Sequence, residues 1–143
     1  MNARNRTKVA SQRMIDFLFP DVDRTFPGMR WVNIMLRTLH LIGTAGMGGA
    51  FLYATPELEW HPFFTLTFVS GFLLMLLAIW SNGIWLIQLR GVATIVKLML
   101  LSLAFAGGME PAILFTIIAI SGVIAHAPGK VRYYLVFPVP RFN

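Results

Sequence analysis

Cysteine is absent from this 143-residue sequence, and its absence excludes several chemistries at once. Without a thiol, the chain forms no disulfide, no thiolate metal site, no CxxCH haem attachment and no cysteine-bound iron–sulfur cluster. Patterns of the GxSxG, HExxH, Walker and GxGxxG kinds are absent as well. We therefore predict that the chain is not an enzyme and has no metal site of its own.

Acidic residues are also scarce, with six Asp and Glu against twelve Lys and Arg. None of the six lies inside a long apolar run, which argues against a carboxylate relay for protons or cations across a membrane. The eight Met residues are scattered instead of clustered as in a copper relay, and the three His residues are dispersed. A copper-handling or small-solute transport protein is therefore the least favoured of our hypotheses.

The composition is that of a membrane protein. Hydrophobic residues make up 57% of the sequence and charged residues 13%, with a mean hydropathy of +0.68. A soluble domain of this size is less apolar, and a lipid bilayer is the natural solvent for such a chain. The formal charge of +6 does not indicate nucleic-acid binding, because the basic residues flank apolar runs instead of forming a patch with interleaved aromatic residues.

Four apolar runs predict four transmembrane helices, at residues 31–53, 63–86, 92–106 and 112–125. Polar segments rich in proline, glycine or charge separate these runs, at 55–62, 88–91 and 107–111. The predicted fold class is an all-α membrane protein, a four-transmembrane-helix bundle. The predicted organisation is a cytoplasmic N-terminal segment (1–28), the transmembrane domain (29–127) and a cytoplasmic C-terminal tail (128–143).

The N-terminal segment predicts an amphipathic helix on the inner membrane surface. Residues recur there at helical spacing until Pro20 stops the pattern. The residues that form this pattern are Val9, Ala10, Arg13, Met14, Phe17 and Leu18. The alternative interpretation is a disordered basic tail.

The basic residues are placed asymmetrically along the chain. Ten of the twelve Lys and Arg lie in the first thirty residues, the 88–91 loop and the C-terminal tail. The other two connections carry the acidic residues Glu57, Glu59 and Glu110 instead. The positive-inside rule then places both termini in the cytoplasm. We expect Arg30, Lys130 and Arg132 to bind anionic lipids of the inner leaflet.

A polar face runs along the first helix, because Asn33, Arg37, His40 and Thr44 follow one another at steps of four, three and four. Arg37 lies about 9 Å from the inner boundary of this helix, and Lys97 reaches about the same depth on the third helix. These two cations predict an anionic site that would hold a lipid phosphate, a haem propionate or a carboxylate of another subunit. The alternative is that both side chains extend to the headgroups of the inner leaflet.

His40 lies near the predicted middle of the membrane, where many membrane cytochromes ligate haem. Bis-His ligation needs a second imidazole at the same depth, whereas His61 and His126 belong to opposite ends of their helices. Haem b would therefore need a second chain that supplies its own His40 or a Met. The alternatives are a hydrogen bond within the bundle and a contact with a quinone or a metal.

Small residues form a stripe beside the polar face, at Gly43, Gly46, Gly49 and Ala50. Such stripes let helix backbones approach closely in membranes, so we predict helix packing along them.

The stretch Leu39-His40-Leu41-Ile42-Gly43, followed by Met47-Gly48-Gly49, resembles the first helix of CopD-like and DUF2269-type membrane families. In those families a Trp-Gly-Gly often follows the Leu-His pair, and Met47 replaces that tryptophan here. The lysine in Val96-Lys97-Leu98-Met99-Leu100-Leu101 is similar too. The resemblance covers the first three helices and implies a small four-helix unit of a bacterial membrane, sometimes linked to copper handling or to cytochrome-like bundles. The positions that it carries over are His40, Gly48, Gly49 and Lys97.

These observations favour a non-catalytic small subunit or accessory protein of a larger membrane complex, or a homo-oligomer. The first alternative is an electron-transfer subunit that binds haem b or contacts a quinone through His40, Arg37 and Lys97.

Overall fold

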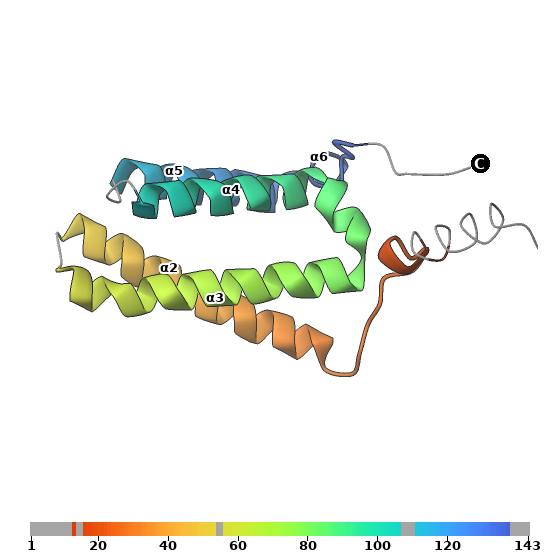
Figure 1. Cartoon of the computed structure of the whole chain (residues 1–143), viewed down its shortest axis with the longest axis horizontal. Coiled ribbons are helices and arrows are strands. Elements are labelled where there is room, and N and C mark those ends of the chain that lie inside the picture. The colour runs from red at the N-terminus through yellow and green to blue at the C-terminus, as the bar shows by residue number, and fades with distance from the viewer. Residues whose placement is uncertain (1–12, 14–15, 54–55, 107–110, 138–143) are drawn as a thin grey trace, which may run out of the picture.

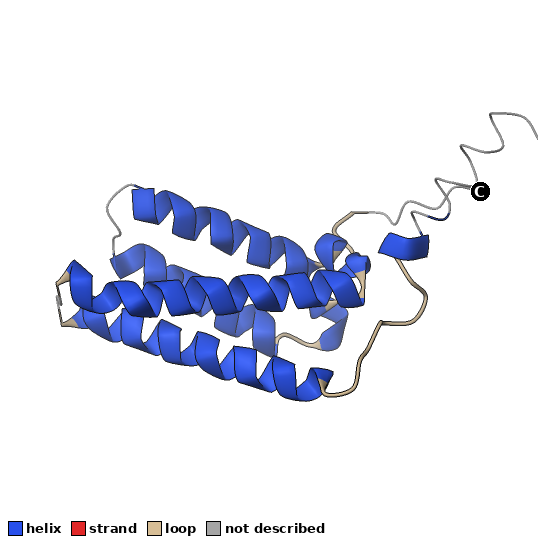
Figure 2. Cartoon of the chain, turned by 60° about the horizontal axis from the view of Figure 1, so that its bottom comes forward, coloured by secondary structure: helices blue, strands red, loops and turns tan. Residues whose placement is uncertain are grey.

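The computed structural model describes residue 13 and residues 16–53, 56–106 and 111–137. These residues form helices and connecting turns and contain no β-strand, which confirms the all-α prediction (Figure 2). The four long helices are α2 (Met29–Leu52), α3 (Glu57–Ser81), α4 (Leu89–Ala106) and α5 (Pro111–His126). The two short elements are the 3-10 helix η1 (Gly83–Ile87) and α6 (Gly129–Arg132).

The long helices form two helical hairpins that lie as two layers along the long axis of the molecule (Figure 1). Helix α2 packs most extensively against α3, α4 packs against α5, and α2 also contacts α5. Residues 16–28, η1 and residues 129–137 lie at one end, which we call the capped end. The end of α2, the start of α3, the end of α4 and the start of α5 lie at the other, the turn end.

The four predicted runs match the four long helices, but two boundaries differ. Helix α3 begins at Glu57, so part of the predicted 55–62 turn is helical and Pro62 lies inside the helix. Pro62 is the sixth residue of the helix, so it removes the backbone bond that this position would otherwise donate to the carbonyl oxygen of Leu58. The helix ends at Ser81 instead of Leu86, because the backbone of Asn82 is extended. Its side-chain oxygen accepts a hydrogen bond from Ile84 N at 3.0 Å and starts η1.

Two further predicted segments differ in extent or fall outside the described residues. Helix α4 begins at Leu89, so Arg90 and Gly91 belong to its first turn and not to a loop. Residues 16–18 are helical, whereas most of the predicted amphipathic helix lies outside the described residues. The predicted turn at 107–110 and the last six residues of the tail also lie outside them.

Among the described helices, one is long and apolar enough to cross a membrane, over Leu58–Ser81, with a hydropathy of 2.2. The apolar stretch Ala112–His126 is shorter. Helix α2 has the length, but its glycines and its polar face lower its hydropathy. Length and composition alone thus support one membrane-spanning helix among the described residues.

The core is small and joins both hairpins. Among the described hydrophobic residues, three are buried, namely Met47 on α2, Leu101 on α4 and Leu114 on α5, and we call them the apolar layer. Four partly buried residues pack against this layer, namely Phe51, Phe64, Ile117 and Ile118. Many other large apolar side chains are exposed on all four long helices, including Leu41, Leu73, Leu103 and Val123. An apolar surface of this extent is typical of a chain that packs against lipid or a partner.

Candidate functional site

Glycines set the contact between α2 and α3. A Cβ atom built on Gly43 would lie 2.7 Å from the backbone nitrogen of Thr67 and 2.9 Å from the carbonyl oxygen of Phe63. The ring of Phe63 covers Gly46 in the same way. By contrast, a Cβ atom on Gly49 would meet no atom within 4 Å, and Ala50 is half-buried. The small-residue stripe therefore packs against α3 through Gly43 and Gly46.

The imidazole ring of His40 crosses this contact and rests on Gly71 of α3. Its Nδ1 atom lies 2.9 Å from the carbonyl oxygen of Thr67 and 3.3 Å from the hydroxyl oxygen of Ser70. Because a carbonyl oxygen only accepts hydrogen bonds, Nδ1 must carry the proton and donate it. In the neutral ring, Nε2 is then left with a free lone pair. In the neutral ring, Nε2 is therefore the nitrogen that can accept a hydrogen bond or bind a metal.

Lys97 turns toward the neighbouring helix of its own hairpin. Its ammonium nitrogen donates to the hydroxyl oxygen of Ser121 on α5 at 3.0 Å. Ser121 in turn donates to the carbonyl oxygen of Ile117 one turn earlier.

The positions of His40, Lys97 and Ser121 along their helices place them at a similar level of the bundle. His40 and Ser121 each lie seven residues from the member of the apolar layer on their own helix, and Lys97 lies four residues from its own. Seven residues are nearly two helical turns and four are about one, so the polar side chains share a face with the apolar layer. They lie about 6 to 10 Å nearer the capped end. We call this second layer, formed by His40, Thr67, Ser70, Lys97 and Ser121, the polar layer.

The other residues of the predicted polar face do not reach across to a second helix. Asn33 donates to the carbonyl oxygen of Met29, and Thr44 donates to that of His40, both within α2. Arg37 is exposed and makes no hydrogen bond or ion pair with the described residues. The structure therefore pairs Lys97 with Ser121, and it leaves Arg37 at the surface of α2.

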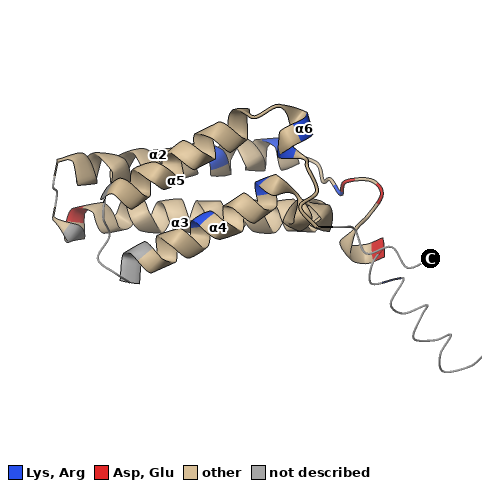
Figure 3. Ribbon diagram, turned by 90° about the horizontal axis from the view of Figure 1, so that it is seen from above, with Lys and Arg blue, Asp and Glu red and all other residues tan. Residues whose placement is uncertain are grey.

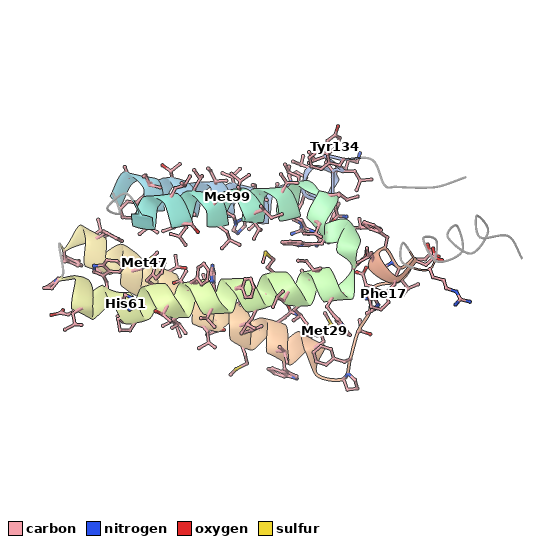
Figure 4. All side chains as sticks on the ribbon, in the orientation of Figure 1. Phe17, Met29, Met47, His61, Met99 and Tyr134 are labelled. Atoms are coloured by element: carbon pink, nitrogen blue, oxygen red, sulfur yellow. The ribbon has the colours of Figure 1, made fainter. Side chains whose placement is uncertain are left out.

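The two remaining histidines lie about 7 to 9 Å from the polar layer along the helix axes, on opposite sides of it. His61 is in the second turn of α3 at the turn end, among the aromatic rings of Trp60 and Phe64 (Figure 4). His126 is the last residue of α5, and its ring bonds to the carbonyl oxygen of Gly122. One chain therefore offers a single imidazole at the level where haem would bind.

The N-terminal segment docks on the capped end through backbone and side-chain bonds. Arg24 N donates to the carbonyl oxygen of Ser81 at 2.9 Å, and the hydroxyl of Ser81 donates to that of Arg24. The side-chain amide of Asn82 donates to the carboxylate of Asp23 at 2.8 Å and to the carbonyl oxygen of Pro20 at 3.2 Å. Gly83 is buried because the carbonyl oxygen of Leu18 lies directly against it.

The C-terminal segment docks on the other side of η1. Leu89 N donates to the carbonyl oxygen of Tyr134, and Val136 N donates to that of Ile87. Phe17 and Tyr134 mark the two docked segments at this end (Figure 4). This cap was not predicted from the sequence, although Ser81-Asn82-Gly83 is a typical turn sequence inside an apolar run.

Basic residues gather at the capped end (Figure 3). The guanidinium groups of Arg90 and Arg132 lie over the ring of Tyr133, at 4.6 and 4.9 Å from its centre. Arg30 and Lys130 are exposed. At the turn end, the described charged side chain near the start of α3 is the carboxylate of Glu59. The same end also carries Asp16, Asp21 and Asp23, so its basic residues Arg24, Arg30, Arg90, Lys130 and Arg132 leave it with a net positive charge among the described residues.

Comparison of the chain with known protein families, curated proteins and solved structures found no match. The resemblance to CopD-like families thus stays a prediction.

Proposed function

We propose that this chain is a four-span integral membrane protein with both termini in the cytoplasm, and that it acts as a non-catalytic subunit or accessory protein of a larger membrane complex. The observation that carries this proposal is the capped end, because it gathers both terminal segments and the basic residues at one end of the bundle. Basic residues remain on the cytoplasmic side during membrane insertion.

The dimensions of the bundle support this placement. Helix α2 has 24 residues and α3 has 25, which correspond to about 36 Å each. Trp31 and Tyr53 are 70% and 84% exposed at the two ends of α2. They are separated by about 33 Å along the axis, close to the thickness of a hydrocarbon core. Exposed aromatic residues at this spacing suit the two membrane interfaces.

The surface of the capped end supports an accessory role. Arg90, Lys130, Arg132 and Tyr133 combine positive charge with an aromatic ring at the expected level of the lipid headgroups. The exposed ammonium group of Lys130 is open to a lipid phosphate or to an acidic side chain of a partner subunit.

Single cysteine variants test the topology directly, because the natural chain has no cysteine. We would introduce Thr25→Cys and Val131→Cys at the capped end, and Tyr53→Cys and Leu58→Cys at the turn end. In intact cells, a membrane-impermeant maleimide should label only the two turn-end variants, and permeabilised cells should label all four. Labelling of the capped-end variants in intact cells would contradict the proposed orientation.

Native mass spectrometry tests the subunit role. The chromosomally tagged protein would be extracted in a mild detergent and its mass compared with that of the 16.1 kDa chain. We expect assemblies that contain a second protein at a fixed ratio, or several copies of this chain. A monomer in every mild detergent would contradict the role as a subunit.

A further inference from the structure

We propose that Arg90, Arg132 and Tyr133 bind the phosphate group of an anionic phospholipid at the capped end of the bundle. This inference rests on the proposed placement of the bundle in a membrane, with the capped end at the level of the lipid headgroups. It deepens that proposal, because it names the ligand of this end and adds Arg90 and Tyr133 to the residues that hold it.

The fold brings Tyr133 to Arg90, although more than forty residues separate them in the sequence. Leu89 N donates to the carbonyl oxygen of Tyr134 at 2.9 Å, so a backbone hydrogen bond joins the chain neighbours of these two side chains. The ring of Tyr133 therefore lies against the start of α4, and the guanidinium carbon of Arg90 lies 4.6 Å from its centre. The position of this ring is set by the backbone and not by the two cations alone.

Both guanidinium groups rest on this one ring. The guanidinium carbon of Arg132 lies 4.9 Å from the ring centre, and its Nη2 atom donates to the hydroxyl oxygen of Tyr133 at 3.1 Å. Among the described residues, neither guanidinium group forms an ion pair with a carboxylate, and Asp23 accepts from Asn82 instead. The attraction of each cation to the aromatic ring offsets part of the repulsion between the two like charges. An anion bound to both would offset the rest.

The free hydrogen-bonding groups of this cluster are chiefly donors. A guanidinium group has five N–H donors and no acceptor, and Arg90 donates its Nε–H to the side-chain oxygen of Gln88 at 2.8 Å. Its four terminal N–H groups have no acceptor among the described residues. The hydroxyl oxygen of Tyr133 accepts from Arg132, which leaves its own proton free to donate. Such a set of donors matches an anion with several oxygen atoms, and a phosphate group has this chemistry.

The neighbouring side chains favour a lipid over a soluble anion. Val131, Tyr134 and Phe137 are apolar or aromatic, and all three are exposed in the same segment as Arg132. A segment that exposes both cations and apolar groups is typical of the membrane interface, where the apolar side chains enter the acyl boundary and the cations reach the phosphates. The exposed Lys130 adds a further positive charge, which favours an anionic lipid over a zwitterionic one.

Native mass spectrometry of the purified full-length protein in a neutral detergent provides the first test. The protein is titrated with phosphatidylglycerol or with phosphatidylcholine of the same acyl chains. We expect phosphatidylglycerol to bind about tenfold more tightly, because the choline group would bring a further positive charge to the cluster. Equal affinities for the two lipids, or no binding of phosphatidylglycerol, would overturn the proposal without any variant.

Variants then assign the site. Arg90→Gln should weaken phosphatidylglycerol binding by about tenfold, because it removes hydrogen bonds from a charged group to the phosphate. Arg30→Gln is the matched control, since it removes the same charge from an exposed position at the same end, and it should weaken binding less. Equal losses in Arg90→Gln and Arg30→Gln would show that net charge alone attracts the lipid, and they would overturn the site.

Tyr133→Phe gives a second assignment that keeps both cations and the aromatic ring. It removes only the hydroxyl group, so we expect phosphatidylglycerol binding to weaken by about fivefold. Unchanged binding in Tyr133→Phe would overturn the three-residue site. Each variant is compared only if it is monodisperse and melts cooperatively, and Tyr133→Phe decides alone if Arg90→Gln does not fold.

Other anions have distinct signatures in the same preparation. Inorganic phosphate that displaces phosphatidylglycerol at equal concentration would assign the cluster to a soluble phosphate and would overturn the inference. A polyglutamate peptide that binds more tightly than the lipid, and that no longer binds to Arg90→Gln, would assign the cluster to an acidic partner protein and overturn it too. None of these outcomes affects the cysteine-labelling test, so the membrane topology and the lipid site can fail independently.

Discussion

The Nδ1 atom of His40 on α2 lies 2.9 Å from the carbonyl oxygen of Thr67 on α3, at a point where glycine on both helices brings the backbones together. Gly43 faces Thr67, and Gly71 faces the ring of His40. The hydrogen bond therefore depends on two residues that contribute no side chain. It also holds the imidazole in one orientation, with Nε2 directed away from its α3 partners.

We predict that Gly43→Ala destabilises the α2–α3 hairpin. The new Cβ atom would lie 2.7 Å from Thr67 N and 2.9 Å from Phe63 O, and backbone atoms in two long helices cannot move independently. Overpacking of this kind costs about 1 to 3 kcal/mol. Thermal unfolding in detergent should show a lower Tm. Gly49→Ala is the control, because its Cβ atom meets no neighbour within 4 Å, and an equal loss in both variants would refute the close approach.

We predict that neutral His40 is the tautomer with its proton on Nδ1. Nδ1 of His126 also lies against a carbonyl oxygen, that of Gly122, so nitrogen NMR spectra of protein labelled at histidine should show a protonated Nδ1 and an unprotonated Nε2 at both His40 and His126. The signal that is lost in His40→Phe is that of His40. Gly71→Ala should change this signal, because the added methyl group would lie 2.9 Å from His40 Cε1 and displace the ring. His61 and His126 serve as internal references, since neither contacts Gly71. The Nε2-protonated tautomer at His40 would contradict the bond to Thr67.

Much of this arrangement follows from sequence because helix periodicity is local. The apolar runs predicted four long helices, and the steps between Asn33, Arg37, His40 and Thr44 predicted a shared face. The structure adds that only His40 on this face bonds to another helix, which depends on Gly43 and Gly71 together. The second of these glycines, Gly71, lies on α3, so the spacing of residues along α2 could not predict this contact.

The cap could not be predicted for a related reason. The bonds between the N-terminal segment and Ser81 or Asn82 join residues more than fifty positions apart, and short polar segments carry little signal for distant partners. Ser81-Asn82-Gly83 also lies within a run that reads as one continuous apolar helix. These three residues favour a turn, but the apolar residues on both sides led to the prediction of a single helix over 63–86.

We predict that Lys97→Met raises the stability of the protein. A charge placed within a membrane helix costs about 2.5 to 3.5 kcal/mol on insertion scales, and methionine fills a similar volume without charge. The partner hydroxyl of Ser121 stays satisfied, because it donates to Ile117 O. The Tm in detergent should rise, and Arg37→Met should change it less because Arg37 is exposed. A lower Tm for Lys97→Met would show that the lysine stabilises the bundle.

We predict that Asn82→Asp releases the N-terminal segment while η1 stays intact. The new carboxylate still accepts from Ile84 N, but it no longer donates to Pro20 O or Asp23, and it adds a like charge beside Asp23. Loss of these bonds should speed cleavage by trypsin after Arg24 about tenfold, since cleavage requires local opening. Combining Asn82→Asp with Asp23→Asn swaps donor and acceptor and should slow cleavage again. If the double variant is cleaved as fast as Asn82→Asp, the Asn82–Asp23 contact does not hold the segment.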